Sequence, residues 1–313
     1  MEVKEPNKSE FEPCYLGLSR TQFEERIEAG RNLLASCLLC SRRCGVNRLS
    51  GELGFCRTGD ELKIASITVH NGEEPPLSGE WGSGTVFFSH CSMACVFCQN
   101  YPVSQIGTGR EMAPEELGSE MMRLKKLGVH NINLVTPAHQ VSAFLPALYR
   151  ARSMGLDIPI VYNTSGYESM ECLRLLDGLI DIYLPDMKYS SETNALKYSD
   201  APDYPRQNRL AVKEMFRQVG NLITDEKGIA LRGLVIRHLV LPLEIAGTEE
   251  TLEFIARHIS QEAAISLMAQ YFPAHRAGEY PELERKITGN EYQQAMSLLE
   301  KYGLSNGWVQ DVE

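Results

Sequence analysis

The stretch Cys91-Ser92-Met93-Ala94-Cys95-Val96-Phe97-Cys98, a C-x3-C-x2-C run, organises the rest of the chain. It directly follows a β-branched and aromatic run at 84–89 that predicts a strand. Three thiols from one loop can ligate three irons of a cubane iron–sulfur cluster, whereas a closed cluster takes four cysteines. One iron would stay open, as catalytic metal sites require. The alternative is a zinc knuckle with a borrowed fourth ligand, such as His90 or a remote cysteine, although zinc sites usually pair two C-x2-C knuckles.

Composition limits the classes of protein that fit. The 313 residues are enough for one large domain, alone or with an appendage, and 43% hydrophobic with 23% charged residues is typical of globular proteins. The net charge of −10 argues against a nucleic-acid partner. No secretory signal and no run of about 18–20 apolar residues is visible, so we expect a cytoplasmic protein without a membrane segment. In that compartment the nine cysteines suggest metal ligands rather than disulfides.

A second group of cysteines lies upstream, at Cys37, Cys40, Cys44 and Cys56. The segment between them is rich in glycine and other turn residues, as suits a loop folded around a metal. Four thiolates can close a metal site, so this site would be structural or would transfer electrons. The C-x2-C opening suits zinc, and three close cysteines with a distant fourth also suit an auxiliary [4Fe–4S] cluster. Four unrelated buried cysteines are the remaining alternative.

From residue 84 onward the hydrophobic pattern alternates between strands and helices. The expected strands are apolar runs at 84–89, 131–136, 158–163, 179–184, 233–241 and 264–271. The expected helices are amphipathic stretches at 114–127, 141–154, 168–177, 206–225 and 248–260, with a last one at roughly 289–302. Continuous apolar strands are typical of parallel sheets, and repeated βα units connect by right-handed crossovers. The sequence therefore predicts an α/β protein with a full or partial TIM-like barrel.

The remaining segments flank this barrel. Thr21 followed by Glu24 suggests a capping box for a helix near the amino terminus. The link at 60–83 contains an expected strand at 64–69 and a proline- and glycine-rich segment. Its His70, Glu73 and Glu74 could reach toward the active site or could be solvated loop residues, and they receive no role. We expect three parts: an N-terminal region with the four-cysteine metal site at 1–82, the barrel at 83–276 and a C-terminal helical extension at 277–313.

The C-x3-C-x2-C run, with Phe97 before its last cysteine, resembles the signature of the radical S-adenosylmethionine (SAM) superfamily. The resemblance implies that Cys91, Cys95 and Cys98 hold a [4Fe–4S] cluster, whose open iron is chelated by the amino and carboxylate groups of SAM. It implies reductive cleavage of SAM to a 5′-deoxyadenosyl radical that abstracts a hydrogen atom. It also implies the partial (βα)6 barrel of radical SAM enzymes, with Phe97 beside the adenine; plain core packing is the alternative for Phe97.

In a parallel barrel, ligand-binding residues gather where the strands run into the following loops. Polar residues occupy these positions here: Thr136, His139, Asn163, Thr164, Ser165, Asp186, Lys188, Arg237 and His275. Several resemble those of the activating enzymes of glycyl-radical enzymes, such as pyruvate formate-lyase activating enzyme. Asn163-Thr164-Ser165-Gly166 resembles the Asp-Thr-Asn-Gly turn of that family. Asp186-Met187-Lys188 resembles its Asp-x-Lys segment, and the two segments together frame the methionyl end of SAM.

The same resemblance assigns two further roles and shows two departures. The strand around Arg237 resembles the one whose arginine holds the SAM carboxylate, a task that suits a planar guanidinium. His275 resembles the histidine that approaches the adenosine. Asn163 stands where the family has an aspartate beside a monovalent cation. The segment from Thr136 to His139 stands where the family has Gly-Gly-Glu against the SAM amino group, a contact that Thr136 or His139 could replace. For each of these site residues the alternative is a structural polar side chain, whose hydrogen bonds are all made within the barrel and which binds no ligand.

Across 37–276 the chain is most similar to the pyruvate formate-lyase activating enzyme-related subgroup, through its four-cysteine region and Cys98-Gln99-Asn100-Tyr101. The resemblance implies SAM as a partner and a reductant such as flavodoxin or ferredoxin. It implies hydrogen abstraction from a protein, peptide or small-molecule substrate, with glycyl-radical activation among the options. An iron–sulfur electron-transfer protein with two closed clusters is the alternative from another class, with a zinc-stapled binding module beside it. Neither accounts for six βα units with polar groups at successive strand ends.

Overall fold

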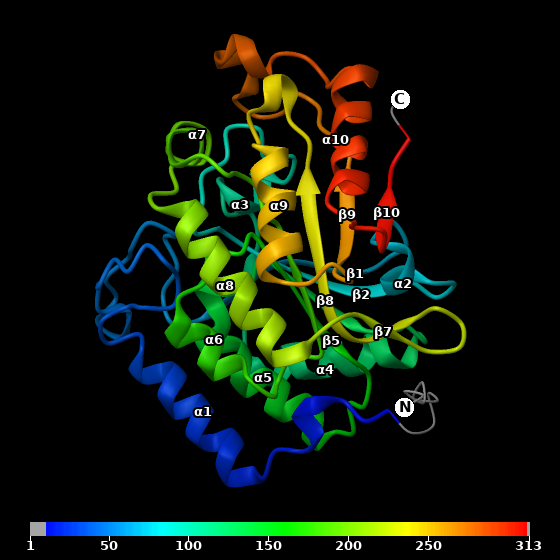
Figure 1. Ribbon diagram of the computed structural model, residues 1–313. Coiled ribbons are helices and arrows are strands. Elements are labelled where there is room, and N and C mark those ends of the chain that lie inside the picture. The colour runs from blue at the N-terminus through cyan, green and yellow to red at the C-terminus, as the bar shows by residue number, and fades with distance from the viewer. Residues whose placement is uncertain (1–10, 312–313) are drawn as a thin grey trace.

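The computed structural model describes residues 11–311, which form one mixed sheet covered by helices (Figure 1). The strands lie in the order β10-β9-β8-β6-β5-β4-β2-β1-β3, and β7 pairs with β8. The barrel consists of six parallel neighbours: β2 (Ser83–Phe88), β4 (Ile132–Val135), β5 (Ile160–Thr164), β6 (Ile182–Pro185), β8 (Ala230–Leu239) and β9 (Ala264–Met268). The predicted α/β fold with a partial TIM-like barrel is thus confirmed.

Four shorter or antiparallel strands extend this barrel. β1 (Leu62–His70) runs antiparallel to β2, and β3 (Arg110–Met112) runs antiparallel to β1. β7 (Ile223–Thr224) is antiparallel to β8, and β10 (Gly307–Val309) is parallel to β9. Only β1 was expected from the sequence, because the other three are two or three residues long and carry no readable period.

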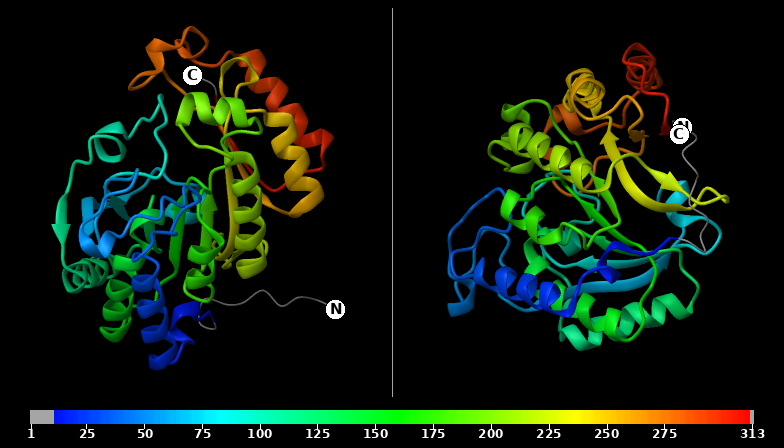
Figure 2. Two further views of the ribbon diagram at one scale, coloured as in Figure 1. Left: turned by 90° about the vertical axis from the view of Figure 1, so that its left-hand side faces the viewer. Right: turned by 60° about the horizontal axis from the view of Figure 1, so that its bottom comes forward.

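The helices connect the strands and cover the outer face of the barrel (Figures 1 and 2). They are α1 (Arg20–Asn32), α2 (Pro75–Ser78), α3 (Tyr101–Ser104), α4 (Pro114–Lys126), α5 (Val141–Ser153), α6 (Met170–Leu176), α7 (Glu192–Ser199), α8 (Tyr204–Val219), α9 (Thr248–His258) and α10 (Gly289–Lys301). Two expectations were wrong in detail. The capping box of α1 is formed by Ser19 and Gln22, two residues before Thr21 and Glu24. α8 ends at Val219 because Gly220 takes a left-handed φ of 72°.

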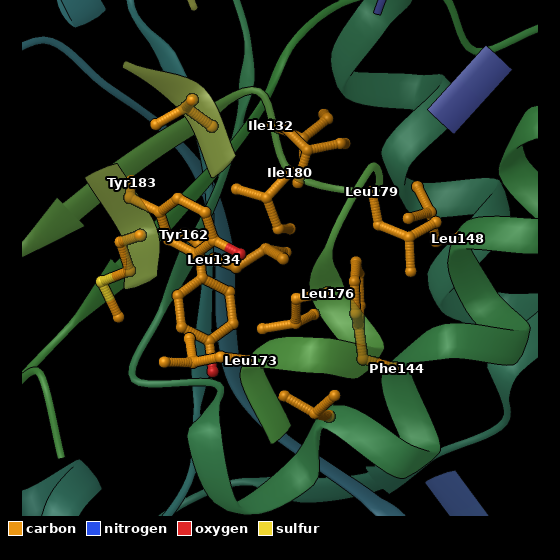
Figure 3. Packing of buried hydrophobic residues seen from close by; sticks show 14 of the residues in the cluster. Ile132, Leu134, Phe144, Leu148, Tyr162, Leu173, Leu176, Leu179, Ile180 and Tyr183 are labelled. Atoms are coloured by element: carbon orange, nitrogen blue, oxygen red, sulfur yellow. The ribbon is translucent and has the colours of Figure 1, made fainter. Parts of the chain in front are cut away.

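The side chains of the barrel strands alternate between two cores. The outward side chains pack under α5 and α6 (Figure 3), where the rings of Tyr162 and Tyr183 lie 5.7 Å apart, edge to face. The inward side chains Val161, Ile182 and Val235 form a smaller cluster inside the barrel. Because the period of a strand is two, the next inward positions of β5 and β8 are Asn163 and Arg237, and on β6 Leu184 is followed by Asp186 just beyond the strand.

A segment at 71–82, which we call the floor segment, closes the barrel at the amino ends of its strands. Its Leu77 is fully buried and packs with Val161, Ile182 and Val235 inside the barrel. The carbonyl oxygen of Leu77 accepts a hydrogen bond of 2.9 Å from Asn131. α2 and two prolines belong to this segment, which the sequence alone suggested only as an ordered loop.

The region around Cys37, Cys40, Cys44 and Cys56 lies beside α6, at the carboxyl ends of the barrel strands (Figure 1). The backbone N–H of Ser41 donates to the carbonyl of Tyr167, which follows β5, at 3.0 Å. Arg42 donates to the carbonyl of Ser92 at 2.5 Å, and Arg48 donates to that of His139 at 2.8 Å. These bonds attach the region to three successive strand ends. No helix within residues 11–311 has the length and apolar character needed to cross a membrane.

Candidate active site

The loop after β2 presents Cys91, Cys95 and Cys98 at the carboxyl end of the barrel. Two of its backbone N–H groups, from Ala94 and Val96, donate to carbonyl oxygens at the end of α7, at 2.9 and 2.8 Å. Burial raises the pKa of the thiols of Cys91 and Cys95, and the neighbouring cysteines of the loop raise it further. The three thiols are therefore close enough to interact electrostatically. All nine cysteines of the chain are free thiols in the structure.

Each of the three sulfurs has a polar neighbour. The hydroxyl of Ser199 donates to the sulfur of Cys95 at 3.0 Å, and the hydroxyl of Ser104 lies 3.1 Å from the sulfur of Cys98. The backbone N–H of Met93 donates to the sulfur of Cys91 at 3.4 Å. Hydrogen bonds of this kind favour the thiolate form, which is the form that ligates iron.

The three thiols of this loop suit an iron–sulfur cluster. Each cysteine ligand of a [4Fe–4S] cluster binds a different iron, so three thiols from one loop can hold three of its four irons. Lys188 adds a positive charge that lowers the pKa of Cys95 against the effect of burial. Three soft thiolates beside a cation are a suitable donor set for an iron–sulfur cluster.

A polar network centred on Arg237 brings four of the predicted residues together. Nε of Arg237 donates to Oδ1 of Asp186 at 2.8 Å, and Nη2 donates to Oδ1 of Asn163 at 2.6 Å. Nζ of Lys188 lies 2.6 Å from Oδ2 of Asp186. These residues come from β5, from β8 and from the end of β6, so the strand-end rule placed them correctly. Burial would raise the pKa of Asp186, but Arg237 and Lys188 hold it below its ordinary value.

The guanidinium of Arg237 retains capacity for a ligand. It has five N–H donors, and the described residues accept from one on each of its three nitrogens. One N–H on Nη1 and one on Nη2 remain, and two such donors match the two oxygens of a carboxylate. About one sixth of the Arg237 side chain, 16%, is exposed, so the network is not sealed.

Sequence reasoning missed the third partner of Arg237, which is Glu73 of the floor segment. Oε1 of Glu73 accepts from Nη1 of Arg237 at 3.3 Å. Oε2 accepts from the side-chain amides of Asn133 at 2.5 Å and Asn163 at 3.1 Å. The adjacent Glu74 is also buried, and burial raises its pKa to about 7. Two acids in a proline- and glycine-rich segment just before the barrel were the available signal, but sequence gives no direction for their side chains.

Other predicted residues lie at the strand ends without joining this network. The hydroxyl of Thr164 donates to the buried Glu168, and the carbonyl of Ser165 accepts from Tyr204 at 2.8 Å. The ring of His139 is buried with Nε2 2.8 Å from the carbonyl of Ser89, and burial lowers its pKa to about 3. The backbone of Thr136 has a left-handed φ of 58°. These contacts hold the loops rather than extend into the network.

Aromatic rings surround the cluster loop. Phe97 packs edge-on against Tyr189 and Tyr271, with ring centroids 6.5 and 5.7 Å apart. His275 stacks on Tyr101, with centroids 4.7 Å apart and an interplanar angle of 15°. His275 has a left-handed φ of 51°, a backbone conformation that costs a non-glycine residue energy.

The four upstream cysteines form a second group of interacting thiols. Burial raises the pKa of Cys40 to about 12, and the charges of Cys56, Cys37 and Cys44 raise it further. Nη1 of Arg48 lies 3.7 Å from the sulfur of Cys37. A cavity of about 360 Å³ lies between this region and the cluster loop, and both groups of cysteines contribute to its lining. The two groups therefore lie on either side of one cavity.

A larger cavity lies at the opposite end of the barrel. Its volume is about 1050 Å³, and it is lined by the floor segment, by the segments just before β4 and β5 and by residues around the start of β8. Trp81 and Trp308, the two tryptophans of the chain, both line it. Size alone would favour it as a ligand site, but it contains none of the cysteines and none of the strand-end residues. The chemistry therefore points to the cysteine end.

Comparison with known proteins agrees with this site. Residues 85–255 match the Radical SAM superfamily. An uncharacterised protein of Methanocaldococcus jannaschii is 32% identical over 291 residues, covering 89% of this chain and 78% of its own. A second uncharacterised protein of that organism is 24% identical over 176 residues, covering 51% of this chain and 50% of its own.

Solved structures show lower similarity. A domain of pyruvate-formate lyase-activating enzyme from Bacteroides vulgatus has a TM-score of 0.39 at 15% identity, covering 55% of this chain and 91% of that one. Streptococcus suis SuiB bound to SAM has a TM-score of 0.47 at 12% identity, covering 71% and 48%. The family assignment rests on the sequence matches. The chain belongs to the radical SAM superfamily, membership of which implies a [4Fe–4S] cluster and the cleavage of SAM by a radical mechanism.

Proposed function

We propose that Cys91, Cys95 and Cys98 hold the [4Fe–4S] cluster of this chain and that SAM chelates its fourth iron. The observation that supports this is a single loop with three thiols that each have a polar neighbour, set at the barrel end that also carries Lys188 and Arg237. When bound, the cluster and SAM supply a 5′-deoxyadenosyl radical that removes a hydrogen atom from the substrate.

The residues of the chain bind and orient the cofactor in this proposal. Arg237 uses its two remaining N–H donors for the SAM carboxylate, while Asp186 and Asn163 fix its plane. The stacked rings of Tyr101 and His275 offer an apolar face for the adenosine, beside Phe97. Thr136 or His139 would contact the SAM amino group. The hydrogen bonds of His139, to the backbone of Ser89 and to the side chain of Gln140, do not support this role for His139.

The finer assignment is to the pyruvate formate-lyase activating enzyme-related subgroup. Its support is the pair of sequence segments 163–166 and 186–188, together with the four cysteines upstream of the barrel. The substrate would carry its hydrogen on a protein, a peptide or a small molecule, and a glycyl-radical enzyme is one such protein. A flavodoxin or ferredoxin would supply the single electron that each cleavage of SAM consumes.

We also propose a second metal centre at Cys37, Cys40, Cys44 and Cys56, within an N-terminal region at 1–82 that precedes the barrel at 83–276 and an extension at 277–313. The mutual electrostatic effects of the four thiols support it. Their position across one cavity from the cluster loop suits an auxiliary cluster in electron transfer, and their C-x2-C opening suits zinc.

One experiment tests these proposals together. The protein is reconstituted anaerobically with iron and sulfide, reduced and incubated with SAM, and 5′-deoxyadenosine, iron and zinc are measured on the same sample. We expect 5′-deoxyadenosine with about eight irons, or with about four irons and one zinc, according to the second metal. Cys95→Ala should abolish the 5′-deoxyadenosine and leave the second metal in place. Cluster-loaded protein that neither binds nor cleaves SAM would instead favour an electron carrier with two closed clusters.

A further inference from the structure

Glu73 connects the floor segment to three strands of the barrel. Its two carboxylate oxygens accept hydrogen bonds from Asn133 on β4, Asn163 on β5 and Arg237 on β8. Only 10% of its side chain is exposed. Glu73 lies outside the 85–255 segment that matches the superfamily, so nothing in that match assigns it a role.

The contacts of Glu73 complete the support of Arg237. Asp186 takes Nε, Asn163 takes one N–H of Nη2, and Glu73 takes one N–H of Nη1. A guanidinium is planar, and a partner on each of its three nitrogens fixes both the position and the rotation of that plane. The two N–H donors that remain are then held in a fixed orientation, which favours their binding of a carboxylate.

Glu73 also supplies charge at a place where β5 supplies none. Asn163 is neutral, and its amide oxygen serves Arg237 while its amide nitrogen donates to Glu73. The mostly buried cations Arg237 and Lys188 are paired with the carboxylates of Asp186 and Glu73, one from the barrel and one from the floor segment. The charge of the adjacent Glu74 also acts on Arg237, but among the described residues only Asp186 and Glu73 pair with Arg237 directly. Removing the carboxylate of Glu73 would leave Arg237 one hydrogen-bonded carboxylate, which it shares with Lys188.

We propose that Glu73 is a positioning residue for SAM binding, acting through Arg237, and that the SAM site therefore extends to the floor segment. This inference rests on the proposed role of Arg237. Glu73 need not touch SAM, since its effect is to hold the arginine that does.

Isosteric substitution provides the test. Glu73→Gln keeps the shape of the side chain but turns one of its two acceptors into a donor that faces other donors. The control is Glu80→Gln, an exposed acid of the same segment. Glu73→Asp keeps the charge on a shorter side chain. The dissociation constant of SAM is measured by equilibrium dialysis on cluster-loaded protein, with iron content and thermal unfolding recorded for every variant.

A double-mutant cycle with Arg237→Gln separates positioning from a general structural effect. We expect Glu73→Gln to weaken SAM binding about tenfold or more, Glu73→Asp to recover part of the loss, and Glu80→Gln to match the wild type. The double variant should bind SAM no more weakly than Arg237→Gln alone, because residues that act as one unit are not additive.

Each other outcome overturns the inference in a different way. If Arg237→Gln binds SAM weakly and Glu73→Gln binds it as the wild type does, Glu73 does not contribute to SAM binding. If Glu73→Gln binds SAM more tightly, Glu73 competes with the SAM carboxylate for Arg237. Additive losses in the double variant make its effect structural. Wild-type binding by Arg237→Gln removes the proposed role of Arg237 and the inference with it, and a loaded wild type that binds no SAM overturns the proposed function itself.

Discussion

The hydroxyl of Ser199, the last residue of α7, donates a hydrogen bond of 3.0 Å to the sulfur of Cys95, 104 residues earlier in the chain. The backbone of the same helix end accepts from Ala94 and Val96, so α7 supports the cluster loop both by its main chain and by this hydroxyl. A helix that the sequence did not predict therefore controls the surroundings of one proposed cluster ligand.

Ser199→Ala should make the cluster harder to reduce. A hydrogen bond to a ligating sulfur stabilises the more negative, reduced form of the cluster, so its loss lowers the reduction potential. We expect a shift of about −50 mV, which for one electron corresponds to roughly 1 kcal/mol. A redox titration followed by electron paramagnetic resonance measures it, with the exposed Ser119→Ala on α4 as the control. Equal potentials in both variants would show that this hydroxyl has no effect on the cluster.

Replacing buried cysteines should distinguish ligands from packing. Cys56→Ala should remove the metal of the N-terminal region, whereas Cys172→Ala should retain all metal. Cys172 belongs to α6 and is fully buried, with its thiol beside Tyr162 of β5, and trimming such a side chain should cost about 1 kcal/mol of stability. Iron and zinc per chain, counted after reconstitution, decide between them. Loss of metal in Cys172→Ala, or full metal in Cys56→Ala, contradicts the proposed ligand set.

Glu168 should make stability depend on pH near neutrality. Burial raises its pKa from 4.5 to about 7, so the folded state binds this proton more tightly than the unfolded state does. The stability from this group is therefore complete below about pH 4.5 and is lost as the pH rises through 7. Glu168→Gln should become more stable relative to the wild type over that interval, by up to about 3 kcal/mol.

Urea unfolding of the metal-free proteins at a series of pH values between 4.5 and 8 measures this difference. The exposed pair Glu249–Lys301 offers a control, since Glu249→Gln should show little change across the same interval. A constant difference between Glu168→Gln and the wild type would mean that Glu168 does not titrate there.

Tyr101→Ala should weaken SAM binding severalfold, because the ring that carries His275 is lost. An aromatic contact of this type contributes about 1 kcal/mol. Tyr101→Phe keeps the ring and should bind SAM as the wild type does. Equilibrium dialysis with SAM provides the measurement, and iron content shows whether the cluster is intact. If Tyr101→Ala and Tyr101→Phe bind SAM equally well, the stacked pair is not part of the adenosine site.

The sequence was most informative where apolar residues follow the pattern of a buried strand or an amphipathic helix. Apolar runs located all six parallel strands, and the rule that ligands gather at strand ends brought Asn163, Asp186, Lys188 and Arg237 into one network. These predictions needed only the topology, since parallel strands in register place their ends together.

The same reasoning could not predict which strand-end residues turn away. His139 and Thr164 lie at the expected ends, but the short helical turn at Ala138–Gln140 directs His139 toward Ser89. Thr164, the last residue of β5, follows the inward Asn163, so the alternation of the strand turns it toward Glu168. Glu73 was missed for a related reason, because the destination of the floor segment depends on burial of Leu77 inside a barrel formed by residues further along the chain. Contacts between segments without a readable period are set by tertiary packing.

The cavity below the floor segment has an optical consequence. Since Trp81 and Trp308 are the only tryptophans of the chain and both line it, intrinsic tryptophan emission arises from this one place, at the barrel end away from the cysteines. Trp81 and Glu73 belong to the same short segment, one beside the cavity and the other on Arg237. The tryptophan fluorescence of the unmodified protein therefore reports whether ligand binding at Arg237 changes the structure at the opposite end of the barrel.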